Sequence, residues 1–378
     1  MSLFDMVDPP AGRWAVSVTP EVSELLRHNA PVAIGVSGGK DSQAMALRLA
    51  DYLEEVGHSG PVVCVHADLG RIEWRQSLPV SQRIAERIGL PLTVVRRESG
   101  DLLSRWQQRW ENNVARYSSL SCVKLILPFS TAGMRFCTSE GKSEVISSFL
   151  TKTFPGQKII SAVGIRHEES PARAKMPVSS PQQRLKRRGC SGLQWHPIIS
   201  WKACEVFDYI ASKGESLHEA YTRYGCSRVS CSFCILGSLP DLKAAASCED
   251  NAEVYRQVVA LETISTFAFQ GSRWLGDVAP ELLSPEELEA HALAKQRAEA
   301  RRLQEARIPN HLLYTSGWPQ SIPSYDEAAL LGEVRQAISD IVGIPVGYTK
   351  PGEIIGRYQW LMDSKNASLK KSLAQTAA

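Results

Sequence analysis

The sequence lacks the features that would assign it to several large classes of protein. No apolar run in its 378 residues approaches the roughly 20 residues that a membrane-spanning helix needs, and the N-terminus has neither the basic start nor the apolar core of a signal peptide. Internal repeats and low-complexity tracts are also missing. The net charge is only +3, from 43 Lys+Arg against 40 Asp+Glu, so composition alone does not indicate a nucleic-acid binder. We therefore expect a soluble, cytoplasmic protein with a folded core and no membrane partner.

The distribution of apolar residues predicts an α/β fold. Apolar runs at 31–36, 61–67, 91–95 and 158–165 read as strands, and helical periodicity occupies 41–56 and 73–88. Strands separated by helices of this length predict a Rossmann-like parallel sheet with helices on both faces and a ligand site at the carboxyl ends of the strands. The expected domains are an N-terminal extension (1–30), a nucleotide-binding domain (31–240) and a mostly helical C-terminal region (241–378). In that last region Ser284, Pro285 and Glu287 predict a capped helix that ends near 305.

One loop carries the most specific pattern in the chain. It joins the apolar strand at 31–36 to the following helix, and its residues are Ser37, Gly38, Gly39, Lys40, Asp41 and Ser42. Adjacent glycines let the backbone turn tightly and present several N–H groups to one anion, while the helix N-terminus, the lysine and the serine hydroxyls add to the same cradle. The Walker spacing G-x-x-x-x-G-K-[ST] is missing, so the pattern predicts a pyrophosphate cradle and not a phosphoryl-transfer loop.

A basic stretch follows the fourth predicted strand. Residues 166–188 contain seven Lys or Arg against two Glu, with Ser-Pro breaks, and we expect a mobile basic loop beside the site. Such a loop could neutralise several nucleic-acid phosphates.

Nine cysteines, an odd number, should remain thiols in a reducing compartment. Cys226, Cys231 and Cys234 lie within nine residues, and the C-x2-C pair is suited to holding one metal or cluster. A fourth ligand is needed. The alternative is three incidental core cysteines, and Cys64, inside an apolar strand, is expected in the core.

Several stretches together resemble a known family. The loop at 37–42 is similar to the PP-loop of the adenine-nucleotide alpha hydrolases, which cleave ATP between the α and β phosphates. Three further stretches resemble the phosphoadenosine phosphosulfate reductase-like family over 31–236: Arg135 to Thr138 with Lys142, Gly164 to Ser170 with Arg173, and His196 to Ile198 with Trp201 and Val206. Reductases of that family usually carry a degenerate loop and a Glu-Cys-Gly-type tail, whereas here the loop is complete and no cysteine follows Cys248. Within the family the chain therefore resembles the ATP pyrophosphatases of DNA phosphorothioation.

The resemblance and the loop together assign roles to residues. Lys40, Asp41 and Arg166 are the expected catalytic residues, with ATP and Mg²⁺ as cofactors and Asp41 as the nearest carboxylate for the metal. The expected nucleotide contacts are the loop residues Ser37, Gly38, Gly39, Lys40, Asp41 and Ser42 together with Asp68, Gly164, Arg166 and Arg173. Alternatives remain: Asp41 could complement the helix dipole, Asp68 could form the turn before Gly70, and either arginine could be a solvated charge.

The resemblance also implies the fourth ligand of the cysteine cluster. Cys137 joins Cys226, Cys231 and Cys234, with Cys248 in reserve. A [4Fe–4S] cluster is the first choice and structural Zn²⁺ the second, since both accept four thiolates.

These inferences predict an ATP pyrophosphatase that adenylates an oxygen, preferably of a DNA backbone phosphate, so that sulfur can replace it. A cysteine desulfurase and other subunits of a modification complex are the implied partners, beside the nucleic acid. Two alternatives stay open: a sulfurtransferase acting on tRNA or a small metabolite, and a non-catalytic ATP-sensing subunit of a defence complex.

Overall fold

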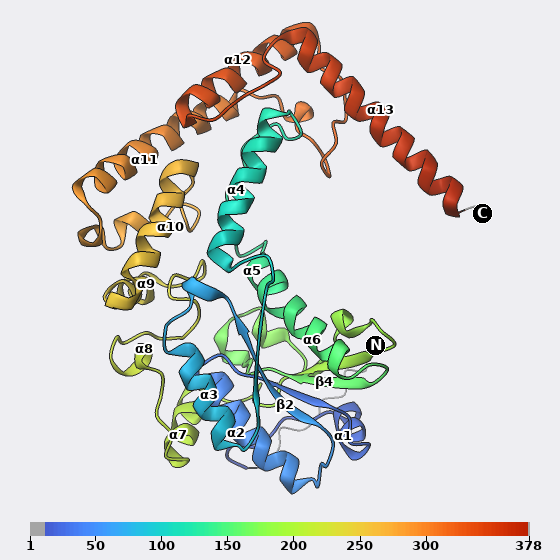
Figure 1. Ribbon diagram of the computed structural model, residues 1–378, viewed down its shortest axis with the longest axis vertical. Coiled ribbons are helices and arrows are strands. Elements are labelled where there is room, and N and C mark those ends of the chain that lie inside the picture. The colour runs from blue at the N-terminus through green and yellow to red at the C-terminus, as the bar shows by residue number, and fades with distance from the viewer. Residues whose placement is uncertain (1–11, 377–378) are drawn as a thin grey trace. The chain divides into compact units, whose positions relative to one another are not determined.

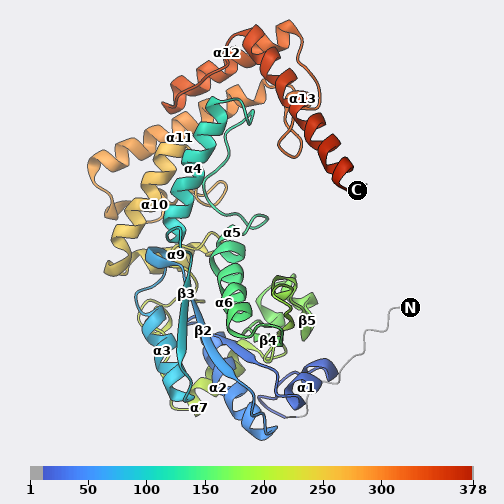
Figure 2. The same ribbon diagram turned by 45° about the vertical axis from the view of Figure 1, so that its right-hand side comes forward.

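The computed structural model describes residues 12–376, which divide into two compact units. The first unit runs up to Leu102 and resumes from Ala132 to Ala252; the second holds Leu103–Thr131 and the chain from Glu253 onward. Residues 103–131, which the sequence pattern places in the nucleotide-binding domain, thus pack with the C-terminal helices. The elements of both units can be followed in Figures 1 and 2.

A six-stranded sheet forms the centre of the first unit. Its strands are β1 (Val32–Gly35), β2 (Val62–Asp68), β3 (Leu92–Arg96), β4 (Lys158–Ala162), β5 (Ser179–Pro181) and β6 (Ser191–Trp195). Their order is β3-β2-β1-β4-β6-β5, and only β5 runs antiparallel to its neighbour. Ile34 of the central strand pairs with Cys64 on one side and Ala162 on the other. The predicted α/β fold with a mostly parallel sheet is confirmed.

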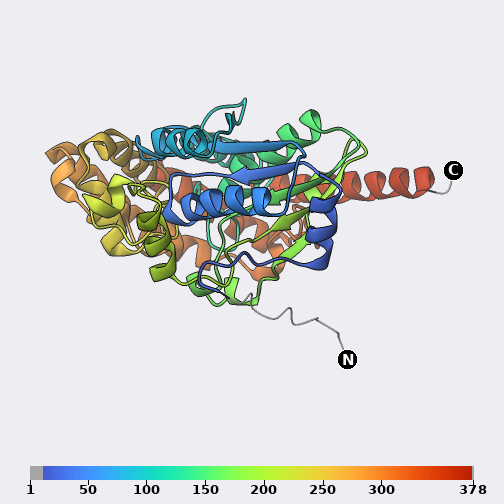
Figure 3. The same ribbon diagram turned by 90° about the horizontal axis from the view of Figure 1, so that it is seen from below.

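Alternating residues of these strands bury opposite faces of the sheet, as the pleat requires. Ile34 packs into a core that includes residues of α1 (Pro20–Arg27), α2 (Lys40–Glu55), α3 (Ser77–Arg87) and α7 (Ala203–Ser212). Its neighbour Ala33 packs on the other face against α6 (Val145–Thr153). Figure 3 shows strands and helices of this unit from below. Cys64 is fully buried in the first core, as predicted.

The basic stretch 166–188 holds regular structure, which corrects the expectation of a loop without any. It contains β5 and three 3-10 turns, His167–Glu169, Arg173–Lys175 and Gln183–Leu185. Leu185 is fully buried. Pro181 is compatible with a strand because β5 is the outermost strand of the sheet, where a missing N–H costs no ladder bond.

The N-terminal segment packs against the sheet domain from residue 12 onward; the first eleven residues of the predicted extension lie outside the described part of the chain. Indole N–H groups of Trp201 and Trp195 donate to the carbonyl oxygens of Ala15 and Ser17, each at 2.8 Å. The segment is therefore part of the sheet domain's own structure.

The remaining elements of the first unit surround the carboxyl ends of the strands or follow β6. They are a 3-10 turn (Gly70–Ile72), α5 (Phe136–Thr138), a π-helical segment (Ser139–Glu144), α8 (Glu219–Thr222), α9 (Leu239–Ala246) and a 3-10 turn (Glu249–Asn251).

The second unit is helical, as expected for the C-terminal region. It consists of α4 (Leu102–Ser118), α10 (Ala252–Ser265), α11 (Pro285–Ala306), α12 (Tyr325–Val342) and α13 (Pro351–Thr376), with 3-10 turns at Leu275–Asp277, Pro280–Leu282 and Asn310–Leu312. The predicted capping box is present: Glu287 N–H donates to Ser284 Oγ at 3.2 Å, and Ser284 N–H donates to Glu287 at 2.8 Å. None of the described helices is long and apolar enough to cross a membrane.

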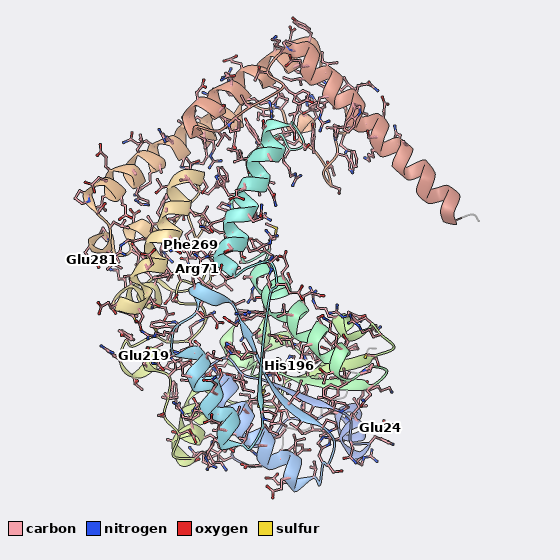
Figure 4. The ribbon with its side chains drawn as sticks, viewed as in Figure 1. Glu24, Arg71, His196, Glu219, Phe269 and Glu281 are labelled. Carbon is pink, nitrogen blue, oxygen red and sulfur yellow. The ribbon has the colours of Figure 1, made fainter. Side chains whose placement is uncertain are left out.

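Aromatic rings bring α4 into this second unit. Trp106 of α4 lies 5.5 Å from Phe129 and 5.7 Å from Phe269, measured between ring centroids. Phe269 is labelled in Figure 4. Arg335 of α12 is fully buried and donates to the carbonyl oxygens of Tyr117 and Gly347, each at 2.7 Å. The contacts of Trp106 with Phe269 and of Arg335 with Tyr117 join residues more than 150 positions apart, so local sequence does not reveal them.

Candidate nucleotide and cysteine site

The phosphate loop lies at the switch point of the sheet, where successive strands are added on opposite sides of β1. Strands β1 and β4 are neighbours at the centre of the sheet, with β2 on the far side of β1 and β6 on the far side of β4. The loop 37–42 leaves the carboxyl end of β1, and 163–166 leaves the carboxyl end of β4. Open α/β sheets bind their ligands at such a point, because two loops diverge there and leave room between them.

Two glycines permit the close packing of this loop. Gly38 has a positive φ of 74°, and a Cβ added there would lie 2.9 Å from the backbone of Ser77. A Cβ at Gly164 would lie 2.6 Å from the carbonyl oxygen of Asp41. Both contacts are with backbone, which cannot move aside, so each position requires glycine. Gly164, predicted only through the family resemblance, is thus brought against the loop.

The two serines of the loop differ in their surroundings. Ser42 is buried; its Oγ accepts from Ser37 N–H at 3.1 Å and donates to the Gly39 carbonyl at 2.9 Å. Ser37 is exposed, although its Oγ lies 3.1 Å from Ser42 Oγ. Ser42 therefore fixes the loop's conformation, and Ser37 is the serine placed to meet a ligand.

The three predicted catalytic residues form one charge cluster. Lys40 Nζ donates to Asp41 Oδ2 at 3.1 Å, and Arg166 Nε donates to Asp41 Oδ1 at 2.6 Å. The Arg166 side chain is only 4% exposed and also donates to Glu168 at 2.8 Å and to the Trp201 carbonyl at 3.3 Å. Although burial opposes its charge, the carboxylate of Asp41 raises the pKa of Arg166 above the usual value. Arg166 thereby orients Asp41 in the described structure.

Asp41 is also the carboxylate predicted to hold Mg²⁺. Both of its oxygens already accept hydrogen bonds from cationic groups, Lys40 and Arg166. Each carboxylate oxygen keeps a second lone pair, so Asp41 could still hold a divalent ion, although the charges of Lys40 and Arg166 oppose it.

The other two predicted nucleotide contacts have local partners. Asp68, at the end of β2, accepts from Gly70 N–H at 2.7 Å. This hydrogen bond belongs to the turn before Gly70, which is the alternative role given to Asp68 above. Arg173 pairs with Glu169, four residues earlier, and its side chain is one-third exposed.

The third stretch of the family resemblance is mainly structural. His196 is fully buried; its Nδ1 lies 2.7 Å from the Pro177 carbonyl and its Nε2 lies 2.8 Å from Gln194 (Figure 4). Burial lowers its pKa. Ile198 and Val206 belong to the main core.

The clustered cysteines share one cavity. Cys226, Cys231 and Cys234 line it together with Trp74, Arg228 and Asp241. Burial raises the pKa of the Cys231 thiol, the nearby Lys142 opposes this, and Cys234, Glu73 and Cys137 raise the pKa further. Burial likewise raises the pKa of Cys226 to about 11, with contributions from Asp241 and Cys248. Neither the four predicted ligands nor Cys248 form disulfides in the described structure.

The thiol side chains are suitable ligands for a metal or cluster, but their positions in this structure do not form a site for one. Cys137 and Cys234 each lie close enough to Cys231 to interact with it electrostatically, while Cys226 interacts with Cys248. Across residues 12–376, no three His, Cys, Asp or Glu side chains surround a common point closely enough to hold a metal ion. The thiol donors suit [4Fe–4S] or Zn²⁺, but they would have to draw together to bind either.

Sequence reasoning missed the aromatic residues around Lys40. Its Nζ lies 5.4 Å from the ring centroid of Tyr221 and 5.7 Å from that of Phe207. The Tyr221 hydroxyl also accepts from the backbone N–H of Lys40 at 3.2 Å. Neither aromatic residue lies in a recognisable motif, and only the position of Tyr221 five residues before Cys226 could have drawn attention to it.

The model of the phosphoadenosine phosphosulfate reductase domain matches residues 31–236, more than half of the chain. The chain belongs to this family. No curated protein matches it. The family supports a general class for this chain, an enzyme that uses adenine nucleotides.

Solved structures with a similar fold include three enzymes. FMN adenylyltransferase from Candida glabrata, in complex with FAD and pyrophosphate, is 16% identical with a TM-score of 0.35, over 54% of this chain and 55% of that one. Phosphoadenylyl-sulfate reductase from Candida auris is 14% identical with a TM-score of 0.34, over 57% of this chain and 97% of that one. A U34-tRNA thiolase from Methanococcus maripaludis, with its [4Fe–4S] cluster, is 12% identical with a TM-score of 0.34, over 68% and 83%. The chain spans about half the length of the first of these structures.

Proposed function

We propose that this protein is an ATP pyrophosphatase, which cleaves ATP to AMP and pyrophosphate and leaves the adenylate on an oxygen of its substrate. An oxygen nucleophile of the substrate attacks the α-phosphorus, and pyrophosphate departs. The preferred substrate is a DNA backbone phosphate, activated so that sulfur can replace the oxygen. Sulfur would come from a cysteine desulfurase, within a complex of modification subunits.

The observation that carries the proposal is the geometry of the loop 37–42. It lies at the point between β1 and β4, with Gly38 forced into a positive φ and Lys40 beginning α2. The loop therefore gathers backbone N–H groups, a helix N-terminus and a lysine without the Walker spacing. This combination suits the binding of a leaving pyrophosphate, whose charge the lysine and amides would stabilise.

The basic surface that could bind a nucleic-acid substrate is smaller than the sequence predicts. Arg184 and Arg187 share one partner, Glu144, at 2.9 and 2.7 Å. Lys175, Lys186 and Arg188 are exposed, and within the described residues none of the three pairs with a carboxylate. These three side chains are the ones we assign to phosphate contacts.

The thiol cavity supports a role in the sulfur step. Cys226, Cys231 and Cys234 line it, with Cys137 nearby, and thiolates there could hold a [4Fe–4S] cluster or, as the second choice, Zn²⁺. A sulfurtransferase on tRNA would use the same loop and thiols, so the identity of the nucleic acid has to be measured.

The decisive experiment follows the products of ATP. Purified protein, supplied with ATP, Mg²⁺ and either duplex DNA or tRNA, should release pyrophosphate as the adenylate forms, and AMP when sulfide or water then displaces the adenylate. Formation of ADP and phosphate would overturn the proposed chemistry, and ATP binding without turnover would favour the sensing subunit. Stronger retention of tRNA than of duplex DNA across a salt series would move the substrate from DNA to tRNA.

A further inference from the structure

One tyrosine hydroxyl joins the phosphate loop to the cysteine segment. Tyr221 Oη accepts from the backbone N–H of Lys40 at 3.2 Å and from the backbone N–H of Val229 at 3.1 Å. Lys40 begins α2, and Val229 lies between Cys226 and Cys231. Tyr221 comes from α8, so a third element holds the other two together.

The two segments also touch directly. A Cβ added at Gly39 would lie 3.4 Å from the Val229 carbonyl oxygen and 3.7 Å from Tyr221 Oη. The Lys40 ammonium lies 5.4 Å from the centroid of the Tyr221 ring, within the range of a cation–π contact. Backbone 221–229 therefore covers one side of the phosphate loop.

The Lys40 N–H is one of the donors that a phosphate would require. It belongs to the first turn of α2, where backbone N–H groups have no acceptor within the helix, and such groups bind anions. Tyr221 Oη accepts this N–H in the place where a phosphate oxygen would. A ligand can take the Lys40 N–H fully only when the hydroxyl leaves it.

We propose that Tyr221 is a positioning residue that makes nucleotide binding and movement of the cysteine segment depend on each other. The inference rests on the proposed function, since it assumes that ATP occupies the loop. When a phosphate takes the Lys40 N–H, the Tyr221 hydroxyl withdraws and the Val229 N–H loses its acceptor. The part of the segment 226–234 around Val229 is then released from α8, while Ser227 and Ser232 keep their hydrogen bonds to Asp241 and to the Ile72 carbonyl. By thermodynamic reciprocity, holding the segment against Tyr221 weakens nucleotide binding by the same factor.

The test compares the wild-type protein with Tyr221→Phe, which keeps the ring and removes the hydroxyl. The probe is α,β-methylene ATP, which the proposed reaction cannot cleave. We expect the variant to bind it about 2- to 10-fold more tightly, because a competing hydrogen bond of ordinary strength is gone. In wild-type protein the analogue should slow amide exchange in the peptide of the phosphate loop and speed it in the peptide containing Val229. In the variant that second peptide should exchange fast from the start.

Tyr209→Phe is the matched control. The Tyr209 hydroxyl donates to Asp51 at 2.9 Å, and the centroid of its ring lies 5.5 Å from the ammonium of Lys213. The variant therefore lacks a comparable hydroxyl that does not contact the phosphate loop. It should bind the analogue as the wild type does.

The outcomes separate the two proposals. If wild-type protein binds the analogue but Tyr221→Phe binds it equally or more weakly, the coupling is wrong and the proposed function stands. If the variant does not fold, the wild-type exchange decides: slower exchange at Val229 on binding overturns the coupling, and faster exchange supports it. If the wild-type protein does not bind the analogue, both proposals fail.

Discussion

Arg166 and Asp41 are 125 positions apart in the sequence, yet the Arg166 guanidinium donates from Nε to Asp41 Oδ1 at 2.6 Å. Arg166 follows β4 and Asp41 lies in the first turn of α2, so the pair ties together the two loops that diverge at the centre of the sheet. Because Arg166 is buried and also bonded to Glu168, its main effect is to orient Asp41 beside Lys40.

Arg166→Lys should show whether Arg166 orients Asp41 or binds a phosphate of the nucleotide. A lysine cannot reach Asp41, Glu168 and the Trp201 carbonyl at once, so we expect the free energy of unfolding to fall by about 1–3 kcal/mol, as for other buried polar groups left without a partner. In ATP cleavage kcat should fall while KM changes little. A raised KM with an unchanged kcat would instead mean that Arg166 contacts the nucleotide.

Arg184→Lys provides the comparison for this variant. Arg184 is exposed and pairs with Glu144 at 2.9 Å, and exposed pairs contribute about 0–1 kcal/mol. An equal loss of stability in both variants would contradict the buried role of Arg166.

Lys40→Ala should cut ATP cleavage roughly 100- to 1000-fold, the loss typical when one preorganised charge-stabilising donor is removed. Lys213→Ala is the matched control, because Lys213 Nζ also donates to an aspartate, Asp51, at 2.8 Å and also lies near a tyrosine ring. Steady-state release of pyrophosphate measures both. Unchanged turnover in Lys40→Ala would place the nucleotide elsewhere.

The parts of the fold that were predictable from sequence are those set by local pattern. The apolar run at 32–35 and the glycines and lysine after it specify β1, the loop and α2, because strand, turn and helix each follow from neighbouring residues. The capping box at Ser284 is equally local. The short edge strand β5 escaped prediction because Ser-Ser-Pro favours a turn, and only pairing with β6 stabilises it as a strand.

The parts that were not predictable depend on contacts between distant residues. Trp106 places α4 with the C-terminal helices by packing on Phe269, and no local feature of 103–131 indicates this. The same holds for Tyr221, whose hydroxyl contacts Lys40 across 181 positions. A single tyrosine on a short helix has no spacing that would mark it.

His218 should make stability depend on pH. It is fully buried, its Nδ1 accepts from Ala220 N–H at 3.0 Å, and burial, with a smaller effect of Arg83, lowers its pKa to about 4. Because the folded protein favours the neutral ring, the contribution to stability is complete above the unfolded pKa of about 6.5 and is lost as the pH falls toward 4. The full loss should be about 3 kcal/mol.

His218→Asn tests this dependence, because asparagine can still accept from Ala220 N–H at the helix N-terminus but does not titrate. Denaturant unfolding between pH 7 and pH 5 should show a smaller drop for the variant than for wild type. His28→Asn, at an exposed position after α1, serves for comparison. Parallel pH curves for wild type and His218→Asn would refute the assignment.

The cysteine site should hold iron when the protein is isolated without oxygen. We expect about four iron and four acid-labile sulfide per chain, and loss of both in Cys231→Ser and in Cys137→Ser. Cys64→Ser, in the sheet core, should retain them. Stoichiometric zinc in place of iron would favour the structural-metal alternative, and retention of iron in Cys137→Ser would remove that residue from the ligand set.

The last prediction concerns the exposed lysines and arginine of 166–188. Replacing Lys175, Lys186 and Arg188 together by alanine should weaken binding to duplex DNA, because these side chains are exposed without carboxylate partners in the described structure. The slope of log affinity against log salt should shrink by up to about one unit per lost phosphate contact. ATP cleavage without nucleic acid should persist, since Lys40, Asp41 and Arg166 are untouched.

The control for charge alone is a second triple variant, Arg27→Ala with Lys152→Ala and Lys158→Ala. These exposed residues end α1, lie near the end of α6 and begin β4, so they sit toward the amino ends of the strands, opposite the phosphate loop. The two variants change the net charge equally, and long-range attraction falls equally in both. Arg188 itself lies at this end of the sheet, where it donates to Thr151 Oγ1 at 3.0 Å. Direct contact of Lys175, Lys186 and Arg188 with phosphates predicts a larger change in slope for their variant, and equal slopes would leave 166–188 without a role in binding DNA.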